Sequence, residues 1–363
     1  MKINILLPFK EKFDKNQLTP VSITICNNLK YSNFKNSIRV FGREVNNPIY
    51  NENFYGVETS FPFIFGRNKF IAKKMCDLIQ NECASDQFIE LHNRPYLLNY
   101  IKRRLPKIPM SIFFHNDPLT MKGSISASDR DYILDNVEAV FCVSEFIKTK
   151  FLSGIYKNKH KVHVLYNGVE RLIKKFPKKF NEILYVGRLV QEKGVDLFVK
   201  SISEIAHNYV GWKFIICGST KLGAHNKNSY FAKKISQDFD KIGNQTVFKG
   251  FVDSSEVQKL MKRASILVVP SVWDEPFGLV VAEGMSNGAA LITSNVGAIP
   301  EIVGKNGIII NNIDSIKLKN SIEYLINNRS ILNKFQSLSY KGFKFSSKNS
   351  SKKLDNFRMS FIK

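Results

Sequence analysis

Short apolar segments rich in Ile, Val and Phe alternate along the chain with longer segments whose apolar residues recur at helical spacing. In the first half the strand-like runs are KINILLPF, SIRVFGRE, DQFIELHN, PMSIFFHN, VEAVFCVSE and KVHVLYNGV. Between them, NKFIAKKMCDLIQNE and RPYLLNYIKRRL show helical periodicity. Continuously apolar strands that alternate with helices are typical of a parallel sheet covered on both faces. We therefore expect an α/β domain in this half.

A second series of the same kind follows a basic, irregular segment. Five of the ten residues from Arg171 to Phe180 are Lys or Arg and one is proline, which is typical of a linker. The strand-like runs after it are EILYVGRLV, WKFIICGS, TVFKGFV, ASILVVPS, AALITS and NGIII, separated by helical stretches such as GVDLFVKSISEIA and SSEVQKLMKRA. The chain has 363 residues, more than a single hydrophobic core usually serves. Two α/β domains that face each other across a cleft are expected, with ligands at the carboxyl ends of the strands.

The expected boundaries follow from these patterns. We predict an N-terminal domain over 1–170, a linker over 171–180, a C-terminal domain over 181–345 and a closing helix over 346–363. The last of these contains SSKNSSKKLDNFRMSFI, in a basic tail.

Composition excludes several classes of protein. Hydrophobic residues make up 44% and charged residues 23% of the chain, which is ordinary for a globular protein and argues against disorder. No apolar run approaches the roughly 18 residues of a membrane-spanning helix, and INILLPF is too short for a signal peptide. We expect a cytoplasmic protein. The five cysteines are scattered and odd in number, so we expect buried thiols and neither disulfides nor a zinc site.

The formal net charge of +23 suits nucleic acid, an anionic membrane surface or a phosphate-bearing substrate. Residues 1–170 hold 24 basic and 16 acidic side chains, and the remainder holds 30 and 15, so both halves share the excess. No RNA-binding signature and no basic tract interleaved with aromatic residues occurs, and we expect no nucleic-acid partner.

The stretch YVGRLVQEKGVDLF ends a strand at Val186, turns at Gly187, and places Arg188 and Lys193 before a helix that begins near Gly194. Glycine lets the backbone approach a ligand closely, and a helix N-terminus favours anions. Two cations five residues apart can bracket a diphosphate. The alternative interpretation is a tight β–α turn with solvated charges, which is common in α/β folds.

A second stretch, DEPFGLVVAEG, places a carboxylate on either side of an apolar segment. Pro276 sits where a helix can begin, and the amides that follow would attract a phosphate or a sugar hydroxyl. Glu275, in the loop, can accept hydrogen bonds from a neutral sugar, and Glu283, inside the helix, can hold the vicinal hydroxyls of a ribose. The alternative is an acid that complements the helix dipole and a surface glutamate.

These residues resemble a known family. GRLVQEKG followed by PSVWDEPFGLVVAEGMSNGAALITSNVGAIPEIV is similar to the signature of the family 4 retaining glycosyltransferases. The resemblance implies the GT-B fold, with two Rossmann-like domains facing each other across a cleft, the first binding the acceptor and the second a nucleotide sugar. The C-terminal helix would return to the first domain.

The resemblance also implies roles for individual residues. Arg188 and Lys193, beside Gly187, would hold the donor diphosphate. Glu275 would contact the donor sugar as a catalytic residue, and Glu283 the ribose. The backbone of four consecutive residues would contact the sugar and phosphate: Phe277, Gly278, Leu279 and Val280.

The N-terminal half departs from the family pattern. A glycine-rich loop usually follows the first strand, whereas this chain reads PFKEKFDKNQLTPVSI and has no glycine there. The segment FFHNDPLTMKG is similar to a subset that acts in lipopolysaccharide core and surface polysaccharide synthesis. In that subset the histidine that matches His115 lies beside the reacting sugar, so His115 is a second catalytic candidate. His92, in ELHNRP, is a weaker candidate at a similar strand end.

No metal or other cofactor is expected. Many other glycosyltransferases hold a diphosphate through Asp-x-Asp and a divalent ion. Asp129 with Asp131 and Asp238 with Asp240 have this spacing, but both pairs lie in helical patterns, where they are interpreted as solvated acids.

The sequence therefore predicts transfer of a hexose or N-acetylhexosamine from a nucleotide diphosphate sugar, most readily a uridine one, to a saccharide acceptor. The acceptor would belong to lipopolysaccharide or surface polysaccharide synthesis. Two alternatives stay open: a non-hydrolysing nucleotide-sugar epimerase, and a non-catalytic basic protein that binds anionic polymer or lipid. The positive charge also suggests peripheral contact with the anionic inner face of the cell membrane, where a lipid-linked acceptor would be presented.

Overall fold

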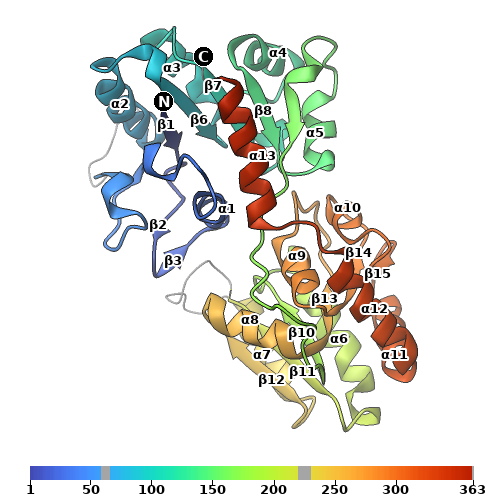
Figure 1. The fold of residues 1–363 in the computed structure, drawn as a ribbon. Coiled ribbons are helices and arrows are strands. Elements are labelled where there is room, and N and C mark those ends of the chain that lie inside the picture. The colour runs from blue at the N-terminus through green and yellow to red at the C-terminus, as the bar shows by residue number, and fades with distance from the viewer. Residues whose placement is uncertain (59–65, 220–229, 362–363) are drawn as a thin grey trace. The chain divides into compact units, whose positions relative to one another are not determined.

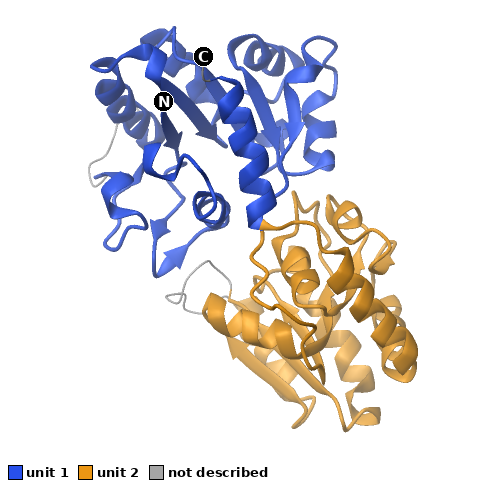
Figure 2. Ribbon diagram, in the orientation of Figure 1, with its two compact units in different colours: residues 1–168, 347–363 blue, residues 169–346 orange. Residues whose placement is uncertain are grey.

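The computed structural model describes residues 1–58, 66–219 and 230–361, and the chain forms two compact units (Figures 1 and 2). Unit 1 comprises Met1–Gly168 and Ser347–Lys363, and unit 2 comprises Val169–Ser346. The basic segment 171–180, which was expected to link two domains, lies within unit 2.

Unit 1 is built on a parallel seven-stranded sheet whose order is β5-β4-β1-β6-β7-β8-β9. The strands are β1 (Lys2–Leu6), β4 (Ile38–Arg43), β5 (Phe54–Val57), β6 (Gln87–His92), β7 (Met110–Phe114), β8 (Ala139–Cys142) and β9 (Val162–Val164). Its helices are α1 (Pro20–Leu29), α2 (Arg67–Gln80), α3 (Leu98–Arg104), α4 (Ala127–Asn136), α5 (Glu145–Leu152) and α13 (Ser347–Ser360). Every residue of β6, β7 and β8 is buried, as expected for central strands covered on both faces.

The segment after β1 takes a form that the sequence pattern did not predict. A short antiparallel hairpin, β2 (Phe13–Asp14) with β3 (Gln17–Leu18), occupies the place where the family resemblance would imply a glycine-rich loop. The chain then enters α1 directly at Pro20, a residue suited to the first turn because it lacks an N–H.

Unit 2 repeats the architecture with a parallel six-stranded sheet of order β12-β11-β10-β13-β14-β15. The strands are β10 (Phe180–Val186), β11 (Lys213–Cys217), β12 (Thr246–Gly250), β13 (Ala264–Val269), β14 (Ala290–Ser294) and β15 (Gly307–Ile310). The helices are α6 (Val195–Ile205), α7 (Tyr230–Asp240), α8 (Ser254–Arg263), α9 (Leu279–Ser286), α10 (Ile299–Val303), α11 (Ser315–Asn327) and α12 (Arg329–Gly342). Both sheets confirm the two Rossmann-like domains.

Each sheet has one point at which the strand order changes direction. In unit 1 the chain moves outward from β1 to β4 and β5, and then returns to the other side of β1 at β6. In unit 2 the corresponding neighbours are β10 and β13. The loops that follow such a pair of strands run in opposite directions. A crevice therefore forms at the carboxyl ends of the two strands, where ligands of doubly wound sheets bind.

The C-terminal helix α13 belongs to unit 1, where it packs against α1 (Figure 1). Arg358 on α13 forms a two-pronged ion pair with Glu90 of β6, at 2.8 and 2.9 Å. Its third nitrogen donates to Asp355, which in turn accepts from Ser32. Arg358 and Glu90 are both almost fully buried, so this network fixes the last helix to the sheet. The return of the helix agrees with the resemblance.

Candidate active site

The loop after β10 is shaped by a glycine and held by a tyrosine. Gly194 has φ +64°, and a Cβ there would lie 2.0 Å from the carbonyl oxygen of Pro270, so no other residue fits without a shift. The hydroxyl of Tyr185 donates to the carbonyl of Arg188 at 3.1 Å and lies 3.4 Å from that of Lys193. The loop that carries both predicted cations is therefore anchored through its own backbone.

Lys193 and Glu275 meet across the two strands that flank the switch point of unit 2. The Lys193 ammonium forms an ion pair and a hydrogen bond with Glu275 Oε1, and Ser271 Oγ donates to the same oxygen at 2.7 Å. Glu275 is buried, so the pair is shielded from solvent. Both contacts use Oε1, and no described residue supplies a hydrogen bond to Oε2. One carboxylate oxygen thus remains free to accept from a ligand.

The backbone of Glu275 is fixed from a third segment. The amide of Ala298 donates to the Glu275 carbonyl at 2.8 Å, and the amide of Gly297 donates to Asp274 Oδ1 at 3.2 Å. Gly297 has φ +55°, and a Cβ at this position would lie 2.4 Å from both the nitrogen and the oxygen of Glu275. A glycine is therefore required for the two loops to lie this close.

Helix α9 begins later than the sequence predicted. Pro276 was expected at its start, but the first helical residue is Leu279, and Gly278 is the N-cap with φ +87°. The amide of Phe277 accordingly precedes the helix. The aromatic ring of Phe277 is buried against Phe345. The amides of Leu279 and Val280 occupy the first turn, where N–H groups have no acceptor within the helix.

Glu283 lies in the middle of α9 and is half-buried. Burial raises the pKa of its carboxyl to about 7, and no charged neighbour offsets that effect. Among the described residues, none donates a hydrogen bond to this carboxyl. A carboxyl group that is half-buried and receives no such hydrogen bond is suited to accepting hydrogen bonds from a ligand.

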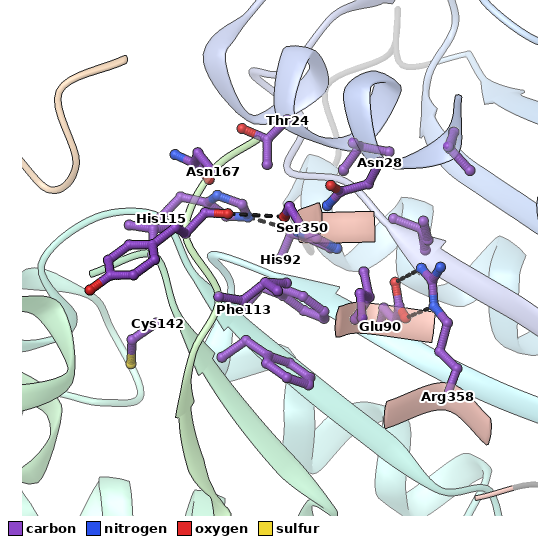
Figure 3. Close-up of a pocket in the computed structure, with 18 residues that line it drawn as sticks. Thr24, Asn28, Glu90, His92, Phe113, His115, Cys142, Asn167, Ser350 and Arg358 are labelled. Atoms are coloured by element: carbon purple, nitrogen blue, oxygen red, sulfur yellow. Dashed lines mark hydrogen bonds and ion pairs between the residues drawn. The ribbon is translucent and has the colours of Figure 1, made fainter. Parts of the chain in front are cut away.

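Unit 1 holds a cavity at the carboxyl ends of β6, β7 and β8, closed on one side by α13 (Figure 3). His115 follows β7 and is 8% exposed, and its Nε2 lies 2.8 Å from Nδ1 of His92, the last residue of β6. Burial lowers the pKa of His115 to about 4 and that of His92 well below its ordinary value. Both imidazoles are therefore neutral near pH 7. The other titratable side chains that line the cavity are Glu90, Cys142, Tyr166 and Arg358.

The backbone of His115 is held by Asn93, which follows His92. The side-chain oxygen of Asn93 accepts a hydrogen bond from the His115 amide at 2.8 Å. Asn93 adopts φ +50°, a left-handed conformation that asparagine tolerates better than most residues. This kink directs the Asn93 side chain back to the end of the neighbouring strand.

Residues 169–344 match the family model described as "Glycosyl transferases group 1". Unit 2 is a group 1 glycosyltransferase domain. An uncharacterised glycosyltransferase of Methanocaldococcus jannaschii, MJ1178, is 32% identical over 235 residues, which are 64% of this chain and 62% of that protein. Spore coat protein SA of Bacillus subtilis is 26% identical over 65% of this chain and 68% of its own length. The matched segments thus span about two thirds of these relatives.

Solved structures agree with the fold of the whole chain. Anabaena Alr3699/HepE in complex with UDP and glucose superposes with a TM-score of 0.74 at 17% identity, covering 99% of this chain and all of that one. A glycosyltransferase from Rickettsia africae gives a TM-score of 0.76 at 17% identity, covering 100% and 98% of the two chains. At this identity the likeness establishes the GT-B type of fold.

The glycosyltransferase domain brings together some of the predicted donor residues. Lys193 and Glu275 are in contact, and Gly187 and Arg188 share the loop of Lys193. Arg188 is exposed, and no ion pair or hydrogen bond holds its guanidinium within the described ranges. Within the described part of the chain, no hydrogen bond or ion pair joins the Glu283 side chain to these residues. Their roles in binding remain predictions.

Sequence reasoning missed Ser271, Tyr185 and Asn93, although all three hold predicted site residues in place. Ser271 carried a usable signal, because it is the polar residue that ends the ASILVVPS strand run. The sequence also predicted that the five cysteines are buried. This is wrong for two of them, since Cys83 is exposed and Cys26 is only partly buried.

The two Asp-x-Asp pairs lie on α4 and α7, in the helical contexts that were expected. Across residues 1–58, 66–219 and 230–361, no group of three or more His, Cys, Asp or Glu could hold a metal ion. Within the same ranges, no helix is long and apolar enough to cross a membrane.

Proposed function

We propose that this protein transfers a hexose or N-acetylhexosamine from a nucleotide diphosphate sugar, most readily a UDP sugar, to a saccharide acceptor with retention of anomeric configuration. The acceptor would belong to lipopolysaccharide or surface polysaccharide synthesis. The contact of Lys193 with Glu275 carries the proposal, because it joins a cation and a buried carboxylate with a free oxygen at the switch point of a group 1 glycosyltransferase domain. The solved HepE structures with UDP, with UDP and glucose, and with UDP-glucose support the choice of donor.

The leaving diphosphate gains negative charge as the glycosidic bond breaks. Arg188 and Lys193 would neutralise that charge, and the amides of Leu279 and Val280 would add hydrogen bonds at the positive end of α9. In this scheme the two cations and the amides would make a metal ion unnecessary.

The carboxylates would hold the neutral parts of the donor. Glu275 Oε2 would accept from a hydroxyl of the donor sugar, while Oε1 stays bound to Lys193 and Ser271. Glu283, once ionised, would accept from the ribose hydroxyls. His115 would position the reacting sugar and the acceptor, and the departing phosphate would take the acceptor proton.

The test is a panel of nucleotide sugars incubated with purified protein and a saccharide acceptor in excess EDTA. Proton NMR of the product reads the anomeric configuration directly, and retention is the expected result. Incubation with the nucleotide sugar alone separates transfer from epimerisation, because an epimerase converts its substrate without an acceptor. An inverted product, or turnover only with a divalent ion, would contradict the corresponding part of the proposal.

We further propose that the protein docks reversibly on an anionic membrane surface, where a lipid-linked acceptor would be presented. The net charge of +23 supports this, since each Lys or Arg near such a surface contributes roughly 1 kcal/mol. Sedimentation with vesicles should show binding that rises with the fraction of anionic lipid and falls with added salt. Equal binding to neutral and anionic vesicles would exclude electrostatic docking.

A further inference from the structure

Aromatic neighbours position the His92 ring independently of its contact with His115. It ends β6 at 3% exposure, and its ring stacks on Phe113 with centroids 4.3 Å apart and an interplanar angle of 11°. Phe113 in turn stacks on Phe141 of β8 at 4.7 Å. The aromatic column therefore fixes the plane of the His92 imidazole, and the plane directs its Nδ1 at His115.

The hydrogen bond between the two rings couples their tautomers. A neutral imidazole carries one N–H and one bare nitrogen, so the pair holds two protons on four nitrogens. One proton lies between His92 Nδ1 and His115 Nε2. The other must then lie on one of the two outer nitrogens, so the pair presents one donor and one acceptor.

Both outer nitrogens are buried without a partner in the cavity wall. His92 Nε2 and His115 Nδ1 have no hydrogen bond within the described part of the chain, and neither do the side-chain oxygens of Asn28 and Asn167. All four residues line the same cavity (Figure 3). Unsatisfied buried polar atoms are costly, and a cluster of four around one cavity indicates a polar occupant.

The size of the cavity limits what can fill it. The space open to the centre of a water molecule is about 20 Å³. One water requires roughly 10–15 Å³ on the same measure. The cavity therefore accepts one water, or one hydroxyl group of a ligand that displaces it, and a hydroxyl can donate to one of these acceptors while it accepts from the outer N–H.

We propose that His92 is a positioning residue that fixes the ring orientation and tautomer of His115, so that the pair binds a single ligand hydroxyl as one unit with Asn28 and Asn167. The inference rests on the proposed function for the identity of the hydroxyl, which belongs to a sugar. The hydrogen bond between the rings is a property of the protein itself and can be tested without any substrate.

The first experiment is nitrogen NMR of protein labelled with ¹⁵N-histidine. The expected result is a scalar coupling between His92 Nδ1 and His115 Nε2 across the shared proton, with both rings neutral at pH 7. Six histidines are present, and spectra of H92N and H115N proteins assign the two coupled signals. Absence of the coupling in the unsubstituted protein, or an even mixture of His115 tautomers, would overturn the proposal whatever the activity.

The second experiment compares two substitutions in transfer assays. H92F retains an aromatic ring against Phe113 but removes the hydrogen bond, and we expect kcat to fall about 10- to 100-fold with little change in the donor KM. H92N retains a polar nitrogen near the Nδ1 position, and we expect it to recover much of that loss. The control is H160N, an exposed histidine outside the cavity.

The outcomes separate this inference from the proposed function. If the coupling is present but no nucleotide sugar is used, the transfer function fails and the histidine pair stands. If transfer occurs and H92F matches the unsubstituted protein in kcat and in the His115 tautomer, the positioning role fails. Should H92F fail to fold, the coupling in the unsubstituted protein and the kinetics of H92N still decide the question.

Discussion

The switch points of the two sheets share a topology and differ in chemistry. At the edge of unit 2, Gly194 and Gly297 adopt conformations that other residues resist, and an ion pair between Lys193 and Glu275 lies over the strands. At the edge of unit 1 the segment after β1 forms a hairpin, and two neutral imidazoles are buried beside the Glu90–Arg358 ion pair, whose charges compensate each other. One framework thus supports a charged site and an uncharged one.

The difference follows from what each site would have to hold. A diphosphate brings several negative charges, which need cations and amides brought close by glycine turns. A sugar hydroxyl is neutral, and an imidazolium beside it would carry an uncompensated charge into a buried cavity. Burial prevents this by lowering the pKa of His115 to about 4.

The largest expected effect concerns the stability of unit 1. R358M leaves the Glu90 carboxylate buried without its partner, and removal of one member of such a pair costs about 3–5 kcal/mol. Denaturant unfolding should show this loss in R358M. The E90Q/R358M double variant should recover part of this loss, since Glu90 no longer carries a lone buried charge, while Asp355 still lacks its cation. Because the predicted diphosphate contacts lie in unit 2, binding of the nucleoside diphosphate alone to the folded variant should be unchanged, and a parallel loss of that binding would break the comparison between the two sites.

The next effect concerns the charge on unit 2. K193A should lose about 2.7–4 kcal/mol of transition-state stabilisation, the scale for one donor that stabilises developing negative charge. Steady-state kcat/KM for donor transfer would then fall roughly 100- to 1000-fold. K200A, which removes an exposed lysine on α6, is the matched control and should retain its rate. Similar kcat/KM values for K193A and K200A would contradict a role for Lys193 in the site.

The smallest effect concerns Glu283 and depends on pH. Because burial raises its pKa from 4.5 to about 7, the folded state loses stability as the pH rises through this range. E283Q should therefore be more stable than the unsubstituted protein by roughly 1–3 kcal/mol at pH 8 and equal to it at pH 4.

Donor affinity of the unsubstituted protein should fall as the pH drops below 7, and the donor affinity of E283Q should not vary in that range. Thermal unfolding and calorimetry at several pH values measure both, and a pH-independent stability difference would contradict the assigned pKa.

The strands of both sheets could be predicted from the sequence, because central parallel strands are continuous apolar runs. Exceptions are local: β5 and the β2–β3 hairpin are short, and their residues carry no strong periodicity. Helix α9 was placed too early because Pro276 is a good first-turn residue, whereas Gly278, with its positive φ, decides the true start.

The site could be predicted only in part. The loop residues Lys193 and Glu275 were identified, but their contact joins positions 82 apart in the chain, which periodicity cannot reveal. Pairing of His92 with His115 depends on the neighbouring order of β6 and β7 and was missed for the same reason. The segment from Arg171 to Phe180 resembled a linker, yet Lys179 donates to the carbonyls of Met261 and Asn287 within unit 2.

The central claim is that unit 2 binds a sugar-linked diphosphate through Lys193 and backbone amides without a metal ion. Isothermal titration of a UDP sugar in excess EDTA, with the unsubstituted, K193A and K200A proteins, tests it most directly. We expect binding to the unsubstituted and K200A proteins with affinity independent of added Mg²⁺, and at least tenfold weaker binding to K193A, a difference of about 1.4 kcal/mol or more. Binding that requires Mg²⁺, or equal affinity in all three proteins, would contradict it.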